Sequence, residues 1–112
     1  MRFSHKYLAV TVISAAMLCF ATWPVQGAEN GEAIYKERCA VCHGADASGH
    51  TGMGKMYKLR DLKSPEVQKM TDTQLYALIA HGKDKMPAFE NTLGKQKIDA
   101  VIAHLRELAK QK

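Results

Sequence analysis

Cysteine and aromatic residues are scarce in this chain of 112 residues. Its three cysteines are too few for a dense disulfide scaffold, and their odd number leaves at least one unpaired. The sole tryptophan is Trp23, and no run of basic residues carries interleaved aromatics, so nothing indicates nucleic-acid binding. Apolar residues make up 46% and charged residues 24% of the chain, which argues against a disordered chain or a multi-pass membrane protein. The length predicts one small domain.

Acidic residues are absent from residues 1–28. This segment begins with basic residues, continues as an apolar run from Tyr7 to about Trp23, and ends in the small residues Gly27 and Ala28. That order predicts a secretory signal peptide that is cleaved near its end. The alternative is an uncleaved membrane anchor, because about 17 apolar residues reach the lower limit for a spanning helix.

The remaining residues, 29–112, form the predicted domain. Removing the signal segment takes away two of the 16 basic residues and none of the 11 acidic ones, which leaves a formal net charge of about +3. A domain this short buries only about 60% of the surface that its unfolded chain exposes. Domains of this size often need a disulfide, a metal or a cofactor for stability.

The segment Cys39-Ala40-Val41-Cys42-His43 carries the strongest chemical signal in the sequence. Two thiols three positions apart, followed directly by a histidine, are what covalent haem attachment requires. Each thiol can add to one vinyl group of the porphyrin, and the adjacent imidazole can bind the iron from one side of the ring. We therefore predict one covalent haem c on Cys39 and Cys42, with His43 as an axial iron ligand.

Two other kinds of site share part of this pattern. A redox disulfide between Cys39 and Cys42 expects a preceding strand and a βαβ setting, which the sequence does not indicate. A zinc site needs a fourth ligand, for which His50 is available, but such sites usually close with a second paired set. That second set is missing from the chain.

With this motif, the sequence resembles the class I monohaem c-type cytochromes, in their small bacterial periplasmic form, over essentially all of residues 29–112. The resemblance implies an all-α fold with about four helices wrapped around one covalently bound haem. It implies that the first and last helices cross. It also implies that a methionine from the later half of the chain is the second axial ligand.

Met86 is the best candidate for that second ligand. It precedes Pro87 in an extended loop that can press a side chain toward the ring, as the Met-Pro loop does in the resembled family. A thioether is a soft ligand that favours ferrous iron and raises the reduction potential. The rival side chains are Met53, Met56, Met70, His50, His81 and His104.

Capping signals and hydrophobic spacing predict four helices. Of these, the third is expected to end at Gly82 and the last to run to about Ala109. The predicted helices begin near Asn30, at Pro65, after Thr71 and near Lys95.

Gly31 and Tyr35 lie four positions apart on one face of the first predicted helix. In the resembled family, a glycine and an aromatic residue at this spacing form the crossing with the last helix. The last helix often carries an aromatic residue at that crossing, where this chain offers His104.

The stretch between His43 and Ser64 is rich in glycine and is predicted to be a loop that covers the haem. Many members of the resembled family have a proline here, whose carbonyl orients the ligating histidine. This chain has none, so we expect a carbonyl within residues 52–56 to accept from His43. Five side chains are candidates for contact with the haem or its propionates: Tyr57, Lys58, Leu59, Arg60 and Leu62.

The leading functional hypothesis is a periplasmic single-electron carrier that is not an enzyme and that serves redox protein partners of a respiratory chain. Because two axial ligands fill the iron's coordination sphere, a change of oxidation state is the chemistry that remains. One alternative is a haem sensor or weak peroxidase in which Met86 leaves the iron. Another is a membrane-tethered subunit of a respiratory complex, held by the uncleaved segment. Lysines expected to surround the haem edge are Lys36, Lys55, Lys58, Lys83 and Lys85.

Overall fold

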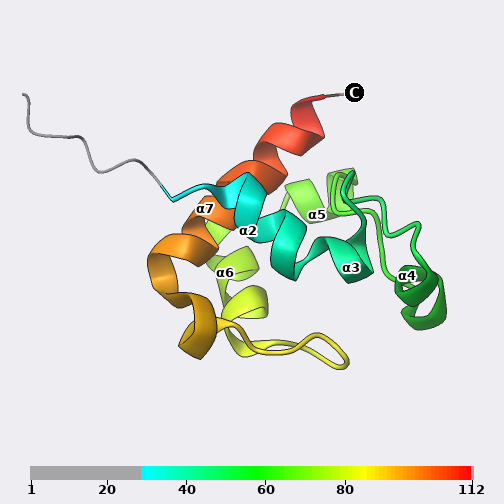
Figure 1. Cartoon of the computed structure of the whole chain (residues 1–112). Helices are drawn as coiled ribbons and strands as arrows, with labels where there is room; N and C mark the ends of the chain where they lie inside the picture. The colour runs from blue at the N-terminus through cyan, green and yellow to red at the C-terminus, as the bar shows by residue number, and fades with distance from the viewer. Residues whose placement is uncertain (1–28, 112) are drawn as a thin grey trace, which may run out of the picture.

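A computed structural model describes residues 29–111, and the predicted signal segment, residues 1–28, lies outside that range. The described chain is helical, which confirms the predicted all-α class, and its only strand-like pairing is one isolated bridge between Lys83 and Met86. None of the described helices has the length and apolar character needed to cross a bilayer. In chain order the helices are α2 (Gly31–Arg38), α3 (Ala40–His43), α4 (Gly52–Tyr57), α5 (Pro65–Gln68), α6 (Asp72–His81) and α7 (Glu90–Lys110) (Figure 1).

Local capping explains where the helices begin. In four of the described helices the N-cap side chain accepts a hydrogen bond from a backbone N–H in the first turn, which would otherwise lack a partner. Thr71 and Gln74 form the predicted capping box, with bonds in both directions. The capping side chains are Asn30 for α2, Thr51 for α4, Ser64 for α5 and Thr71 for α6.

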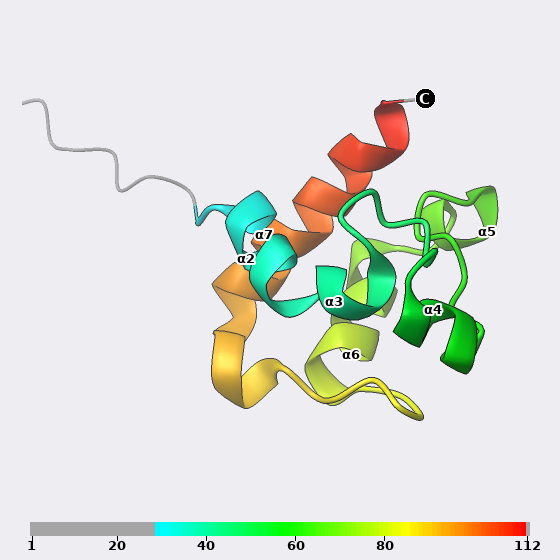
Figure 2. The same ribbon diagram turned by 45° about the vertical axis from the view of Figure 1, so that its right-hand side comes forward.

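The crossing of α2 with α7 is confirmed and depends on a glycine. Gly31 is buried, and a side chain there would overlap the backbone carbonyl of Ala100 on α7. Tyr35, one turn further along α2, lies with its ring centroid 5.3 Å from that of His104. Both views of the ribbon show α2 lying against α7 (Figures 1 and 2).

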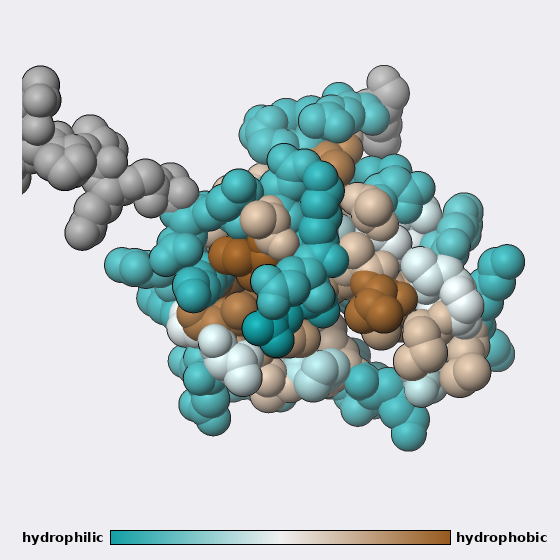
Figure 3. All heavy atoms as spheres, in the orientation of Figure 1, coloured by the Kyte–Doolittle hydropathy of each residue, from teal (hydrophilic) through white to brown (hydrophobic). Residues whose placement is uncertain are grey.

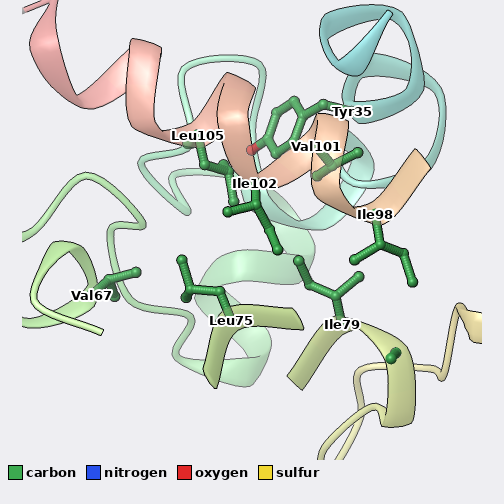
Figure 4. Close-up of a cluster of buried hydrophobic side chains, with 10 residues drawn as sticks. Tyr35, Val67, Leu75, Ile79, Ile98, Val101, Ile102 and Leu105 are labelled. Carbon is green, nitrogen blue, oxygen red and sulfur yellow. The ribbon is translucent and has the colours of Figure 1, made fainter. Parts of the chain in front are cut away.

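The hydrophobic core lies between α2, α6 and α7 (Figure 4). Helix α7 packs against both other helices. Its buried side chains recur at helical spacing, as the sequence predicts. The core is completed from α2, α5 and α6, and its largest members are Tyr35, Val67, Leu75, Ile79, Ile98, Val101, Ile102 and Leu105.

Arg106 connects the C-terminal part of α7 to the turn between α5 and α6. Its guanidinium donates to the backbone carbonyls of Gln68 and Met70, at 3.0 and 2.6 Å. It also pairs with the Asp72 carboxylate at 2.8 Å, and only 24% of the Arg106 side chain is exposed. One side chain thus joins three helices around the core.

One detail of the helix prediction is wrong, because the predicted loop after His43 contains helix α4. The first helix ends at Arg38, directly before the haem motif, where the chain turns at Cys39 and a separate helix α3 follows. The last helix, expected from near Lys95, is preceded by an extra turn from Glu90, and the two join at Gly94, whose φ of 71° and ψ of 169° break the helical path.

Candidate haem-binding site

The haem motif occupies one tight turn of the chain. At Cys39 the backbone departs from regular helix geometry (φ −112°, ψ −38°), and the N–H groups of Cys42 and His43 both donate to the Cys39 carbonyl, at 3.2 and 3.0 Å. Both thiols are free and half-buried. Burial raises the pKa of the Cys39 thiol to about 11, so it is protonated at neutral pH. The turn keeps the two thiols and the imidazole on one short segment.

The His43 imidazole is half-buried, and one of its two ring nitrogens is buried without a partner. Its Nδ1 is the only buried side-chain nitrogen or oxygen within residues 29–111 that makes no hydrogen bond. Burial lowers the pKa of His43, which favours the neutral ring at neutral pH. A neutral imidazole is the form that ligates a metal ion. A buried imidazole nitrogen without a partner costs stability in the protein alone, and no protein group engages this ring.

Hydrogen bonds from three directions hold the backbone around His43. The Thr51 hydroxyl donates to the Cys42 carbonyl at 2.6 Å, and the Gly49 N–H donates to the His43 carbonyl at 2.7 Å. The buried Tyr35 hydroxyl donates to the Gly44 carbonyl at 2.7 Å. Three successive carbonyls are thus fixed, and the backbone at His43 has little freedom to move.

Met86 lies in the loop between α6 and α7. The loop is closed by reciprocal backbone bonds between Lys83 and Met86, at 3.1 and 2.9 Å, and the Phe89 N–H donates to the Ile79 carbonyl at 3.0 Å. The Met86 side chain is half-buried and packs against the hydrophobic core, as Cys39 does. In both ribbon views this yellow loop lies below α3, beyond the end of α6 (Figures 1 and 2).

Exposed apolar side chains gather near the motif. Val41 on α3 is 70% exposed and Met56 on α4 is 69% exposed, while Met53 and Tyr57 are each more than a third exposed. Figure 3 shows an opening in the surface, beside strongly hydrophobic (brown) atoms, in the region where Figure 1 draws α3, α4 and the Met86 loop. A flat apolar group with two reactive vinyl substituents fits this combination of free thiols, a neutral imidazole and uncovered apolar surface.

The remaining rivals of Met86 have other surroundings. Met70 packs against the core, which agrees with a structural role. His104 stacks obliquely on Tyr35 at the helix crossing. The exposed His81 lies on the surface, 3.6 Å from the Glu90 carboxylate. Met53 and Met56 stand on the exposed part of α4, near the motif in sequence.

One expectation about the haem surroundings is wrong. No carbonyl accepts from His43 Nδ1, and those of Gly54 and Lys55 instead accept from the N–H groups that end α4. Arg60, a candidate for a propionate, is paired at the surface with Glu66 at 2.6 Å, and its contact with a propionate stays a prediction.

Sequence reasoning also missed the supporting roles of Thr51 and the Tyr35 hydroxyl. The only local signal for Thr51 is its position as a capping residue before Gly52. For Tyr35 no local signal exists, because its acceptor Gly44 lies nine positions away and is brought near by the turn at Cys39.

Comparisons with known proteins agree with this site. Residues 26–105 match a family model described as cytochrome c oxidase, cbb3-type, subunit III. A cytochrome c6-like protein of Nostoc is 28% identical over 110 residues, with 96% of each chain covered. The cytochrome c6 of Aphanizomenon flos-aquae is 33% identical over 84 residues, which cover 71% of this chain and 88% of that protein. The cytochrome c6 of Thermosynechococcus vestitus is 26% identical over 106 residues, with 93% of this chain and 92% of that protein covered.

The match to the family model spans most of the chain, including the described helices up to Leu105 and the whole haem motif. The relatives align over most of their own length, so the likeness covers the whole small domain rather than the motif alone. The chain therefore belongs to the c-type cytochrome family, as a small monohaem electron carrier with one covalently bound haem c.

Proposed function

We propose that this protein is a periplasmic single-electron carrier whose haem is attached through Cys39 and Cys42 and ligated by His43 and Met86. The observation that carries the proposal is the half-buried His43 imidazole, whose buried Nδ1 has no hydrogen-bond partner, in a turn that also presents both thiols. Half-buried Met86, on a loop closed by its own backbone bonds, supplies the second ligand.

When bound, the haem iron supplies a reversible one-electron change between its ferric and ferrous states. The protein's residues set how readily that change occurs. The Met86 thioether favours the ferrous state, and the apolar surroundings of Cys39 and Met86 disfavour the additional charge of the ferric state. The hydrogen bonds that fix the Cys42 and His43 carbonyls keep the ligand still during the change. We expect a reduction potential well above that of a bis-histidine haem.

Residues 1–28 are proposed to be the signal peptide that takes residues 29–112 to the periplasm, where haem attachment takes place in bacteria. The segment's basic start, apolar middle and small-residue end support this. Detection of the mature amino end by mass spectrometry of the periplasmic fraction would test it. A protein that stays with the membrane until detergent is added would instead support the tethered subunit.

Respiratory redox proteins with an acidic docking surface are the proposed partners. The exposed lysines Lys55 and Lys58 follow one another around α4, and Lys83 and Lys85 lie on the Met86 loop. Within residues 29–111 none of these four forms an ion pair, whereas Lys36 pairs with Glu32 at 2.6 Å. Free positive charge steers an acidic partner, so electron transfer should slow as ionic strength rises. A rate that does not change with salt contradicts this docking mode.

Substitution of Met86 tests the ligation. Met86→Ala should keep its covalent haem but lose the near-infrared sulfur-to-iron charge-transfer band of the ferric protein. Met70→Ala is the matched control, because Met70 is another half-buried methionine packed on the same core. It should keep the band. A Met86→Ala spectrum identical to that of the wild type would show that another residue is the ligand.

A further inference from the structure

Gly82 lies directly against the backbone of the Met86 loop. It ends α6 with φ 71° and ψ 172°, and its N–H donates to the Leu78 carbonyl at 2.9 Å. A Cβ at this position would lie 2.5 Å from the Met86 carbonyl oxygen, 2.8 Å from the Pro87 carbonyl carbon and 2.9 Å from the Ala88 nitrogen. Real Cβ atoms essentially never approach other atoms below 3.0 Å. The loop therefore occupies the space that any side chain at Gly82 would need.

The loop has little freedom to give way. All three atoms in question belong to the backbone, so no side chain can rotate aside. The reciprocal bonds between Lys83 and Met86 close the turn, and the bond from Phe89 to Ile79 fastens its far end to α6. Asp84, inside the turn, already has a φ of 53°, a conformation that side-chain-bearing residues rarely adopt. A shift at Gly82 is thus transmitted to Met86.

We propose that Gly82 is a positioning residue for the axial methionine: the lack of a side chain lets the loop lie against the end of α6, at the distance from which Met86 reaches the iron. This inference rests on the proposed ligation by Met86. Gly82 is not itself a ligand and acts only through the loop backbone that it contacts. A methyl group there moves Met86 outward and makes the iron accessible to small external ligands.

Gly94 provides a matched control within the same chain. Its φ of 71° and ψ of 169° are nearly those of Gly82, so alanine meets the same backbone strain at either position. A Cβ at Gly94, however, has no atom within 4 Å. Any difference between Gly82→Ala and Gly94→Ala therefore reports the contact with the Met86 loop and not the left-handed conformation.

The experiment compares Gly82→Ala, Gly94→Ala and Met86→Ala as haem-containing proteins. The readouts are the sulfur-to-iron charge-transfer band of the ferric form and the carbon monoxide affinity of the ferrous form. Gly82→Ala should weaken the band and raise the affinity at least about tenfold over Gly94→Ala, which corresponds to about 1.4 kcal/mol. Gly94→Ala should retain the wild-type band.

A double substitution tests whether Gly82 acts through Met86. In a Met86→Ala background, Gly82→Ala should leave carbon monoxide affinity unchanged, because the ligand it positions is gone. A further rise in that background overturns the proposal. So does a Gly82→Ala protein with the band and affinity of Gly94→Ala, or one that yields no haem protein where the other two variants do. If Met86→Ala itself keeps the band, the proposed ligation fails, whatever Gly82 does.

Discussion

Replacement of Gly31 by alanine should destabilise the helix crossing on which the haem motif rests. Gly31 is the first residue of α2, and an added Cβ would overlap the carbonyl oxygen and carbon of Ala100 on α7. Both obstructing atoms belong to the backbone of a helix that is itself packed on the core. The strain can be relieved only if the two helices move apart, which opens the contacts of Tyr35 and Val101.

The expected loss in free energy of unfolding follows from two opposing effects. Overpacking of a well-packed contact costs about 1–3 kcal/mol, and a rigid backbone obstacle places this case near the upper end. Alanine gains up to about 1 kcal/mol over glycine in helix propensity. We therefore expect Gly31→Ala to lower the free energy of unfolding by about 2 kcal/mol. Guanidinium titration of the haem protein, followed by far-ultraviolet circular dichroism, would measure it.

Gly52→Ala is the matched control for this prediction. Gly52 is likewise the first residue of a helix after a capping side chain, but a Cβ there meets nothing within 4 Å. Gly52→Ala should be neutral or slightly stabilising. If the two variants have free energies of unfolding within about 0.5 kcal/mol of each other, the close approach of α2 and α7 does not limit stability, and the reasoning is refuted.

Three further substitutions test the electrostatic contacts. Arg106→Ala should cost about 1–3 kcal/mol, because it leaves part-buried carbonyls such as that of Gln68 without a donor. Arg60→Ala removes an exposed ion pair and should lower the free energy of unfolding by less than about 1 kcal/mol. If chemical denaturation shows equal losses of stability for Arg106→Ala and Arg60→Ala, this prediction is contradicted. Hydrogen bonds from the Ser48 hydroxyl and N–H hold the pKa of Asp46 below its usual value. The stabilisation is therefore present above the unfolded-state pKa of about 3.9 and is lost as pH falls through the lowered pKa. Unfolding of Asp46→Asn should differ from the wild type at neutral pH and converge with it in acid, and a difference that is constant with pH would refute this.

The helix ends that depend on neighbouring residues could be predicted from the sequence. Asn30, Ser64 and Thr71 cap helices through bonds that span only three positions. Helix α4 was not predicted, because its glycines favour a loop by local propensity alone. The helix forms where Gly54 packs on the Gly49 carbonyl, a contact that local propensity does not encode.

The motif and the candidate ligands were visible in the sequence because spacing and chemistry define them. The contacts that hold the motif and the Met86 loop in place could not be predicted from the sequence. The bond from Tyr35 to Gly44 depends on the turn at Cys39, and the close packing of Gly82 on the Met86 loop depends on the path of the chain after α6. Such contacts arise from the fold as a whole, so no window of neighbouring residues contains them.

In the proposed function, two protein ligands close the iron and leave electron transfer as its chemistry. The most direct test is the visible spectrum of the reduced wild-type protein, matured with its haem, before and after addition of carbon monoxide. With His43 and Met86 in place, the account predicts no change in the spectrum. A shift of the bands would contradict it, because the iron would then be open to external ligands, as a sensor or a peroxidase requires.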